Sequence, residues 1–87
     1  LLDNLSMNVF PNPTTDKINL IFNLDKPQDY KWIVYNEIGA IVNQSRIKKG
    51  SAGKINETID LDRLKAGIYF VSVIIESEVI TKEFIVN

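Results

Sequence analysis

Residues 64–75 constrain the fold of this chain more than any other segment. After Gly67, every residue except Ser72 is β-branched or aromatic, which suits a packed, pleated surface. The run is too short to cross a membrane as a helix, and it fits a strand buried on both faces in the middle of a sheet. Because glycine adopts positive φ without steric cost, we expect Gly67 to turn the chain sharply into this strand.

The rest of the chain consists of short apolar segments separated by turn residues. Residues 17–24 alternate, with Ile18, Leu20, Phe22 and Leu24 on one face and Lys17, Asn19 and Asn23 on the other, which indicates a strand with one buried face. Similar patterns predict further strands over residues 7–10, 30–36, 40–47, 55–61, 67–75 and 79–86. Seven short strands without a helical period predict an all-β fold, a seven-strand β-sandwich of the immunoglobulin or fibronectin type.

The pattern also predicts which parts are buried and which are exposed. Residues 1–6 are interpreted as a linker remnant, and residues 48–54, with their glycines and lysines, as a mobile exposed loop. In the first strand, Val9 and Phe10 are expected to contact the core. The central core is expected to consist of Leu20, Phe22, Trp32, Val34, Tyr69, Val71 and Val73.

Composition excludes several classes of function. A net charge of -1 gives no electrostatic basis for binding nucleic acid or anionic lipid. The chain has no cysteine and no histidine, so it lacks the usual thiolate nucleophile, the usual general base and the commonest zinc ligand. We therefore expect no cofactor, no metal site and no catalytic site.

Two pairs of carboxylates have residue types that could bind a metal ion or catalyse hydrolysis. Asp60 and Asp62 would share a face of a strand, but calcium requires six to eight oxygen ligands, so we interpret them as turn residues. Glu76 and Glu78 have the residue types of a glycosidase acid–base pair. Since they lie at a hairpin tip, we expect both to face solvent.

Three aromatic residues in one segment suggest a second possibility. Tyr30, Trp32 and Tyr35 are a candidate platform for sugar binding. A single tryptophan in a strand of a small sandwich is more often part of the core, and that is the interpretation we favour.

Other residues are typical of turns. Pro11 and Pro13 cannot donate to a ladder, so their segment cannot lie in a central strand, and Asn12 is expected to bond to nearby backbone. Gly39 is expected in the left-handed conformation of a tight turn. Tyr69 is expected to form a tyrosine corner, in which the phenol bonds back to upstream backbone.

Read in order, these segments resemble the C-terminal sorting domain of type A cargo of the type IX (Por) secretion system of Bacteroidetes. The resemblance covers roughly residues 7–87. The first three motifs are carried by Pro11, Asn12 and Pro13, by Asn36 and Gly39, and by Leu64, Gly67 and Tyr69. The terminal motif is carried by Lys82, Glu83, Phe84, Ile85 and Val86.

The resemblance implies that the domain acts as a secretion signal and is not itself an enzyme. It implies that residues 7–87 form a C-terminal sorting domain with an N-terminal cargo domain in the same parent chain. Such a domain crosses the periplasm, addresses the cargo to the outer-membrane translocon, and is commonly removed by a cell-surface sortase. The cargo is then attached to the surface or released. Asn87 and Glu83 depart from the family pattern, which often has basic residues there.

The last strand is the expected recognition element. We expect residues 82–86, with support from the adjacent strand over residues 67–71, to form an unpaired final strand that offers backbone groups to a partner by strand addition. The segment 11–13 is expected instead to fix how the chain enters the sandwich. Two alternatives stay open, namely an accessory carbohydrate-binding or adhesin-type module and a spacer with no partner.

Overall fold

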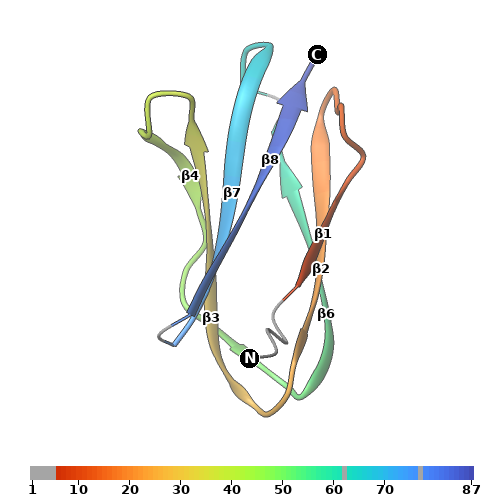
Figure 1. Cartoon of the computed structure of the whole chain (residues 1–87), viewed down its shortest axis with the longest axis vertical. Helices are drawn as coiled ribbons and strands as arrows, with labels where there is room; N and C mark the ends of the chain where they lie inside the picture. Colours follow the sequence, from red (N-terminus) through yellow and green to blue (C-terminus); the bar gives the residue numbers. More distant parts are fainter. Residues whose placement is uncertain (1–5, 62, 77) are drawn as a thin grey trace.

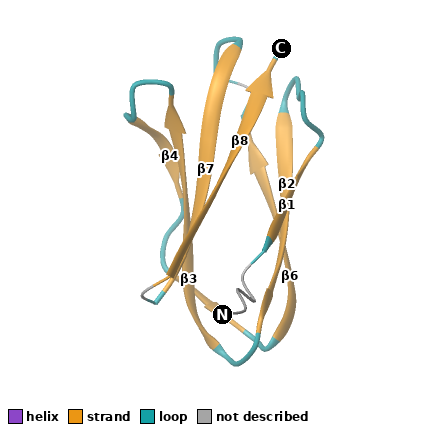
Figure 2. Ribbon diagram, viewed as in Figure 1, coloured by secondary structure: helices purple, strands orange, loops and turns teal. Residues whose placement is uncertain are grey.

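The computed structural model describes residues 6–61, 63–76 and 78–87, which form two packed antiparallel sheets (Figures 1 and 2). The three-stranded sheet has the order β1 (Met7–Phe10), β2 (Lys17–Leu24), β6 (Gly53–Asp60). The five-stranded sheet has the order β4 (Ile41–Gln44), β3 (Gln28–Asn36), β7 (Gly67–Ile75), β8 (Glu78–Val86), and β5 (Lys48–Gly50) also pairs with β3. The described residues include no helix that could span a membrane.

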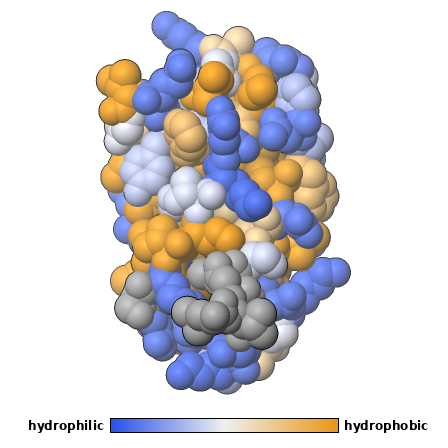
Figure 3. All heavy atoms as spheres, viewed as in Figure 1, coloured by the Kyte–Doolittle hydropathy of each residue, from blue (hydrophilic) through white to orange (hydrophobic). Residues whose placement is uncertain are grey.

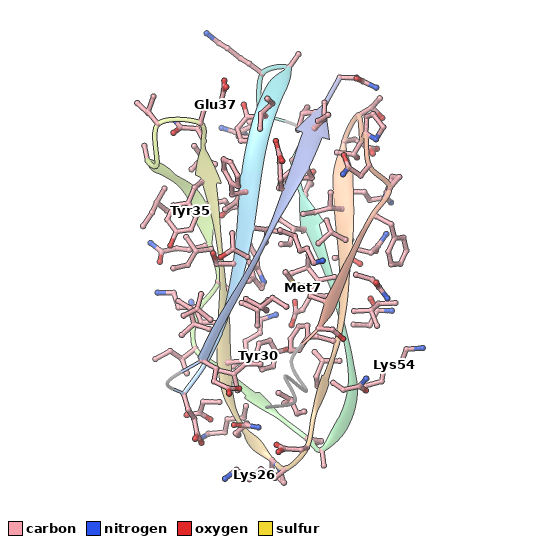
Figure 4. All side chains as sticks on the ribbon, in the orientation of Figure 1. Met7, Lys26, Tyr30, Tyr35, Glu37 and Lys54 are labelled. Atoms are coloured by element: carbon pink, nitrogen blue, oxygen red, sulfur yellow. The ribbon has the colours of Figure 1, made fainter. Side chains whose placement is uncertain are left out.

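The core lies between the two sheets and is built by period-two alternation. In β2, Ile18, Leu20, Phe22 and Leu24 are all buried. The seven predicted core residues are buried too, which confirms the prediction; they are Leu20, Phe22, Trp32, Val34, Tyr69, Val71 and Val73. Figure 4 shows Met7 and Tyr30 between the sheets, whereas Tyr35 and Lys54 point away from them.

Strand β7 occupies the centre of the five-stranded sheet, as its apolar sequence predicts. It pairs with β3 on one side and with β8 on the other. Its inner face is buried, but Ile68, Phe70 and Ile74 on the outer face are only half-buried. Burial on both faces is therefore incomplete, because no further layer of the described residues covers the outer side of this sheet.

The segment 48–54, predicted to be a mobile loop, instead forms part of the sandwich. Residues 48–50 form β5, an eighth strand, and residue 53 begins β6. The ammonium group of Lys48 lies 2.9 Å from the carboxylate of Glu57, which holds β5 against β6. Gly50 packs so closely against Leu24 and Tyr30 that a side chain would not fit. Residues 48–54 have the composition of a loop, and the contacts that order them come from residues distant in the sequence.

Two further predictions about strands were wrong in detail. The strand predicted over residues 40–47 covers only Ile41–Gln44, and Ser45 beyond it bonds back to the Trp32 backbone. Phe10 is 42% exposed, whereas Met7 is buried, because the pleat of β1 turns Met7 and Val9 inward. The linker predicted over residues 1–6 lies outside the described residues except for Ser6, which is exposed.

Candidate recognition edge

Strand β8 is the outermost strand of the five-stranded sheet, and it pairs with β7 along its whole length. Its side chains alternate as the sequence predicts. Phe84 and Val86 are fully buried, and the Phe84 ring stacks on Tyr69 at 5.9 Å between centroids. Lys82, Glu83 and Ile85 are exposed. The final strand is therefore anchored in the core through two residues and presents three others to solvent.

The outer edge of β8 is partly covered by residues 11–14, which we call the strap. Thr14 and Val86 form a parallel bridge, in which the Thr14 N–H donates to the Ile85 carbonyl and the Asn87 N–H donates to the Thr14 carbonyl, both at 2.8 Å. The Asn12 side-chain oxygen accepts a hydrogen bond from the Ile85 N–H at 2.9 Å. The expectation of an unpaired final strand is thus wrong for its last residues. Asn12 bonds to distant backbone, not to the nearby backbone expected for an Asx-turn.

The remainder of this edge has no partner strand within the described part of the chain. In an antiparallel pair, successive residues alternately point their N–H and C=O groups toward the partner and away from it. Since Ile85 directs both groups to the strap, Glu83, Thr81 and Val79 direct theirs to the same outer side. These residues form the open edge, where an extended chain has backbone groups to pair with.

The other sheet edges carry features that discourage pairing. Strand β6 carries the exposed polar side chains of Lys54, Asn56 and Thr58 on the outer face of its sheet. Strand β4 is short, and its register with β3 shifts between Val34 and Tyr35. Charged side chains, short strands and bulges are the usual protection of an edge. Strands β6 and β8 both have a long outer edge without a partner strand in the described part of the chain, and β8 is the one that carries the terminal motif.

Apolar side chains lie beside the open edge. Val79 is 59% exposed and Ile85 is 41% exposed, and both are on the outer face of the sheet. In the space-filling view of this side of the molecule, hydrophobic residues are visible among hydrophilic ones (Figure 3). A partner strand would thus find apolar contacts as well as backbone groups.

Comparison with known proteins agrees with this geometry. A family model described as "Secretion system C-terminal sorting domain" matches residues 8–87. The chain belongs to this family. The resemblance seen in the sequence is thereby confirmed, and the domain is a sorting domain for type IX secretion. Searches of curated proteins and of solved structures gave no match.

In this sorting domain, the sequence motifs converge on one end of the five-stranded sheet. Asn36 pairs with Tyr69, which pairs with Phe84 of the terminal motif. Gly67 pairs with Val86, which in turn is bridged to Thr14 of the strap. The four motifs, which are far apart in the sequence, therefore lie beside one another where β3, β7, β8 and the strap meet.

Two of these motifs shape turns at that end. The Asn36 side-chain oxygen accepts hydrogen bonds from the N–H groups of Ile38 and Ala40, and Gly39 has φ +86°, as predicted for a left-handed turn residue. The Tyr69 hydroxyl donates to the Lys65 carbonyl at 2.7 Å, so the tyrosine corner is confirmed. A hollow of about 230 Å³ separates the two turns and is lined by residues 36–38 and 66–69.

Gly67 has the positive φ predicted for it, but the sharp turn before β7 lies earlier in the chain than predicted. The φ of Gly67 is +158°, near the extended limit, and the residue begins the strand. The change of direction occurs earlier, where the Leu64 N–H donates to the Leu61 carbonyl at 2.9 Å. Leu64 itself packs against the core. These motif residues thus hold the corner together.

The alternative sites of the sorting domain are not assembled. Tyr30 and Trp32 are buried between the sheets and Tyr35 lies on the opposite face of β3, so the three do not form an exposed platform. Glu76 and Glu78 are exposed, as predicted. Among the described residues, no group of three acidic, histidine or cysteine side chains is placed to hold a metal ion. Asp62 of the considered calcium pair lies outside those residues.

Sequence reasoning missed part of the candidate edge. No motif in the sequence points to Val79, Thr81 or Thr14, although the first two complete the open edge and the third bridges to Val86. The alternation of the last strand was the available signal for Val79 and Thr81. No local pattern identifies Thr14, because its partner comes from the opposite end of the chain.

Proposed function

We propose that this domain directs a larger cargo protein, joined ahead of it in the same chain, through the type IX secretion system across the outer membrane. The translocon reads β8, and a sortase then removes the domain. The domain itself is not an enzyme. The observation that carries the recognition step is the open edge of β8, where an exposed strand offers backbone groups at Val79, Thr81 and Glu83.

Within the terminal motif, the residues divide between two roles. Phe84 and Val86 are buried and fix the register of β8 against β7. The other three, Lys82, Glu83 and Ile85, are exposed. Their side chains can be contacted by a binding groove of the partner. Because a shift of one residue would exchange the two faces, the buried pair also fixes which side chains are presented.

The arrangement of the chain supports access to this strand. Strand β8 ends at one end of the sandwich, and β1 begins well away from that end (Figure 1). A cargo domain joined ahead of β1 would therefore enter the sandwich away from Val86, although β1 itself lies beside β8. This placement suits a signal that is read while the cargo is attached.

The proposal is tested by fusing residues 1–87 to a periplasmic reporter in a host that has the secretion system. The substitutions Lys82→Glu and Ile85→Asp change exposed side chains of β8 and leave the buried pair intact. We expect the unaltered fusion to deliver the reporter to the cell surface or medium, and each substitution to leave it in the periplasm.

Two controls match these changes on other strands. Lys54→Glu makes the same charge change on β6, and Ile41→Asp makes the same apolar-to-acidic change at a residue of β4 that is 52% exposed. All four proteins are first checked by thermal melting. If the folded Lys82→Glu and Ile85→Asp variants are exported as well as the controls, β8 is not the main recognition element. If the unaltered fusion is retained, the sorting function itself is wrong.

A further inference from the structure

We propose that the strap occupies the position that the export partner takes on β8, so that the partner binds as an extended segment running parallel to β8 and displaces the strap. This inference rests on the proposed function, and it concerns how the edge is opened and in which direction the partner pairs. In the free domain, residues 11–14 occupy the site on β8 where the partner would bind.

The strap shows which hydrogen-bond donors and acceptors can pair with this part of the edge. It supplies one backbone donor, the Thr14 N–H, to the Ile85 carbonyl at 2.8 Å. It supplies two acceptors, the Thr14 carbonyl for Asn87 N–H and the Asn12 side-chain oxygen for Ile85 N–H. An extended backbone offers the same donors and acceptors in the same parallel direction. A partner strand can therefore replace each of these bonds without any change in β8.

The strap is held to β8 by few interactions. Pro11, Asn12 and Pro13 are exposed, and the two prolines have no N–H to donate. Thr14 is the buried member, at 2% exposure, and its hydroxyl donates to the carbonyl of Lys17 on β2 and not to β8. Besides the burial of Thr14, three hydrogen bonds join the strap to β8, each of modest net free energy because water replaces it on release.

Release of the strap determines how many residues of β8 can pair with a partner strand. With the strap in place, pairing stops after Glu83, because the outward groups of Ile85 are already bonded. With the strap released, the edge extends through Ile85 to Asn87 and includes the whole terminal motif. Full recognition of residues 82–86 therefore requires the strap to leave.

A disulfide that ties the strap to β8 tests this directly. Thr15 and Asn87 each follow a member of the Thr14–Val86 bridge, and both are exposed. The chain has no cysteine of its own, so the double variant Thr15→Cys with Asn87→Cys can form one disulfide only. Each single-cysteine variant is a matched control that carries the same change without the link.

The first measurement is amide hydrogen exchange of the isolated domain. We expect the Ile85 amide, which faces the strap, to exchange at least about tenfold faster than the Phe84 amide, which faces β7, because the strap opens without global unfolding. Oxidation of the double variant should remove this difference. Equal protection of the two amides in the unaltered domain would overturn the inference.

The second measurement is export of the reporter fused to the same variants. We expect the oxidised double variant to lose export, and both single variants, as well as the double variant under reducing conditions, to retain it. Export of the oxidised double variant at the level of the single variants would refute strap displacement and leave the sorting function standing. Retention of the unaltered fusion would instead refute the sorting function.

Discussion

The Tyr30 hydroxyl on β3 donates a hydrogen bond to the carboxylate of Glu57 on β6, and this bond joins the two sheets of the sandwich. Lys48 of β5 approaches the same carboxylate, with its ammonium nitrogen 2.9 and 3.0 Å from the two oxygens. Burial of Tyr30, reinforced by the bond to Glu57 and by its negative charge, raises the pKa of the Tyr30 hydroxyl well above its usual range.

The raised pKa of Tyr30 predicts a loss of stability in alkaline solution. The stabilising contribution is complete below the unfolded-state pKa of about 10 and is lost as pH rises beyond it, because only the unfolded state then releases the proton. Relative to Tyr30→Phe, the unaltered protein should lose up to about 1.4 kcal/mol of unfolding free energy per pH unit above about pH 10. Urea titrations at several alkaline pH values measure this difference. Parallel losses in both proteins would contradict the assignment.

Trp32 is predicted to contribute strongly to stability through packing. It is buried, and its indole N–H has no hydrogen-bond partner among the described residues. Trp32→Ala should lower the unfolding free energy by about 3–5 kcal/mol, as large aromatic truncations do. Trp32→Phe should lower it much less, since it keeps a ring and removes a buried donor that makes no bond. Chemical denaturation of both variants provides the test, and equal losses would argue against it.

The tyrosine corner gives a third prediction. The Tyr69 hydroxyl bonds to the Lys65 carbonyl at 2.7 Å, whereas Tyr35 lies half-buried on the outer face of the same sheet. We expect Tyr69→Phe to lower the unfolding free energy by about 0.5–1.5 kcal/mol, the usual net value of one hydrogen bond. Tyr35→Phe is the control with the same chemical change and should have a smaller effect. A reversed order in thermal or urea denaturation would show that the corner does not stabilise the fold.

Gly50 gives a fourth prediction, based on close packing. A Cβ atom at this position would lie 2.4 Å from a methyl carbon of Leu24 and 3.1 Å from the Tyr30 ring. Gly50→Ala should therefore lower the unfolding free energy by about 1–3 kcal/mol through overpacking. Ala52→Gly, at the nearby exposed turn, controls for general sensitivity of this segment and should change stability less. Unchanged stability of Gly50→Ala would mean that β5 can shift without cost.

The sequence by itself determined the elements whose pattern is local. The alternation in residues 17–24 and the apolar run after Gly67 depend on period two and on residue type, and both appear as β2 and β7 with the expected side chains in the core. The turn at Asn36 and Gly39 and the corner at Tyr69 were likewise predictable, because their hydrogen bonds join residues a few positions apart. The terminal motif's alternation was also evident, so its buried and exposed residues were known in part.

Only the tertiary structure decided the features that join distant segments. The strap pairs with β8 because Asn12 meets Ile85, 73 residues later, and no local signal encodes that contact. The sequence of β5 is typical of a loop, because Lys48 gains its partner Glu57, and Gly50 its close packing, only after the sheets assemble. The open edge of β8 is likewise set by which strands come to lie beside it. Sequence patterns fix which face of a strand is buried, but strand neighbours are chosen by contacts across the whole chain.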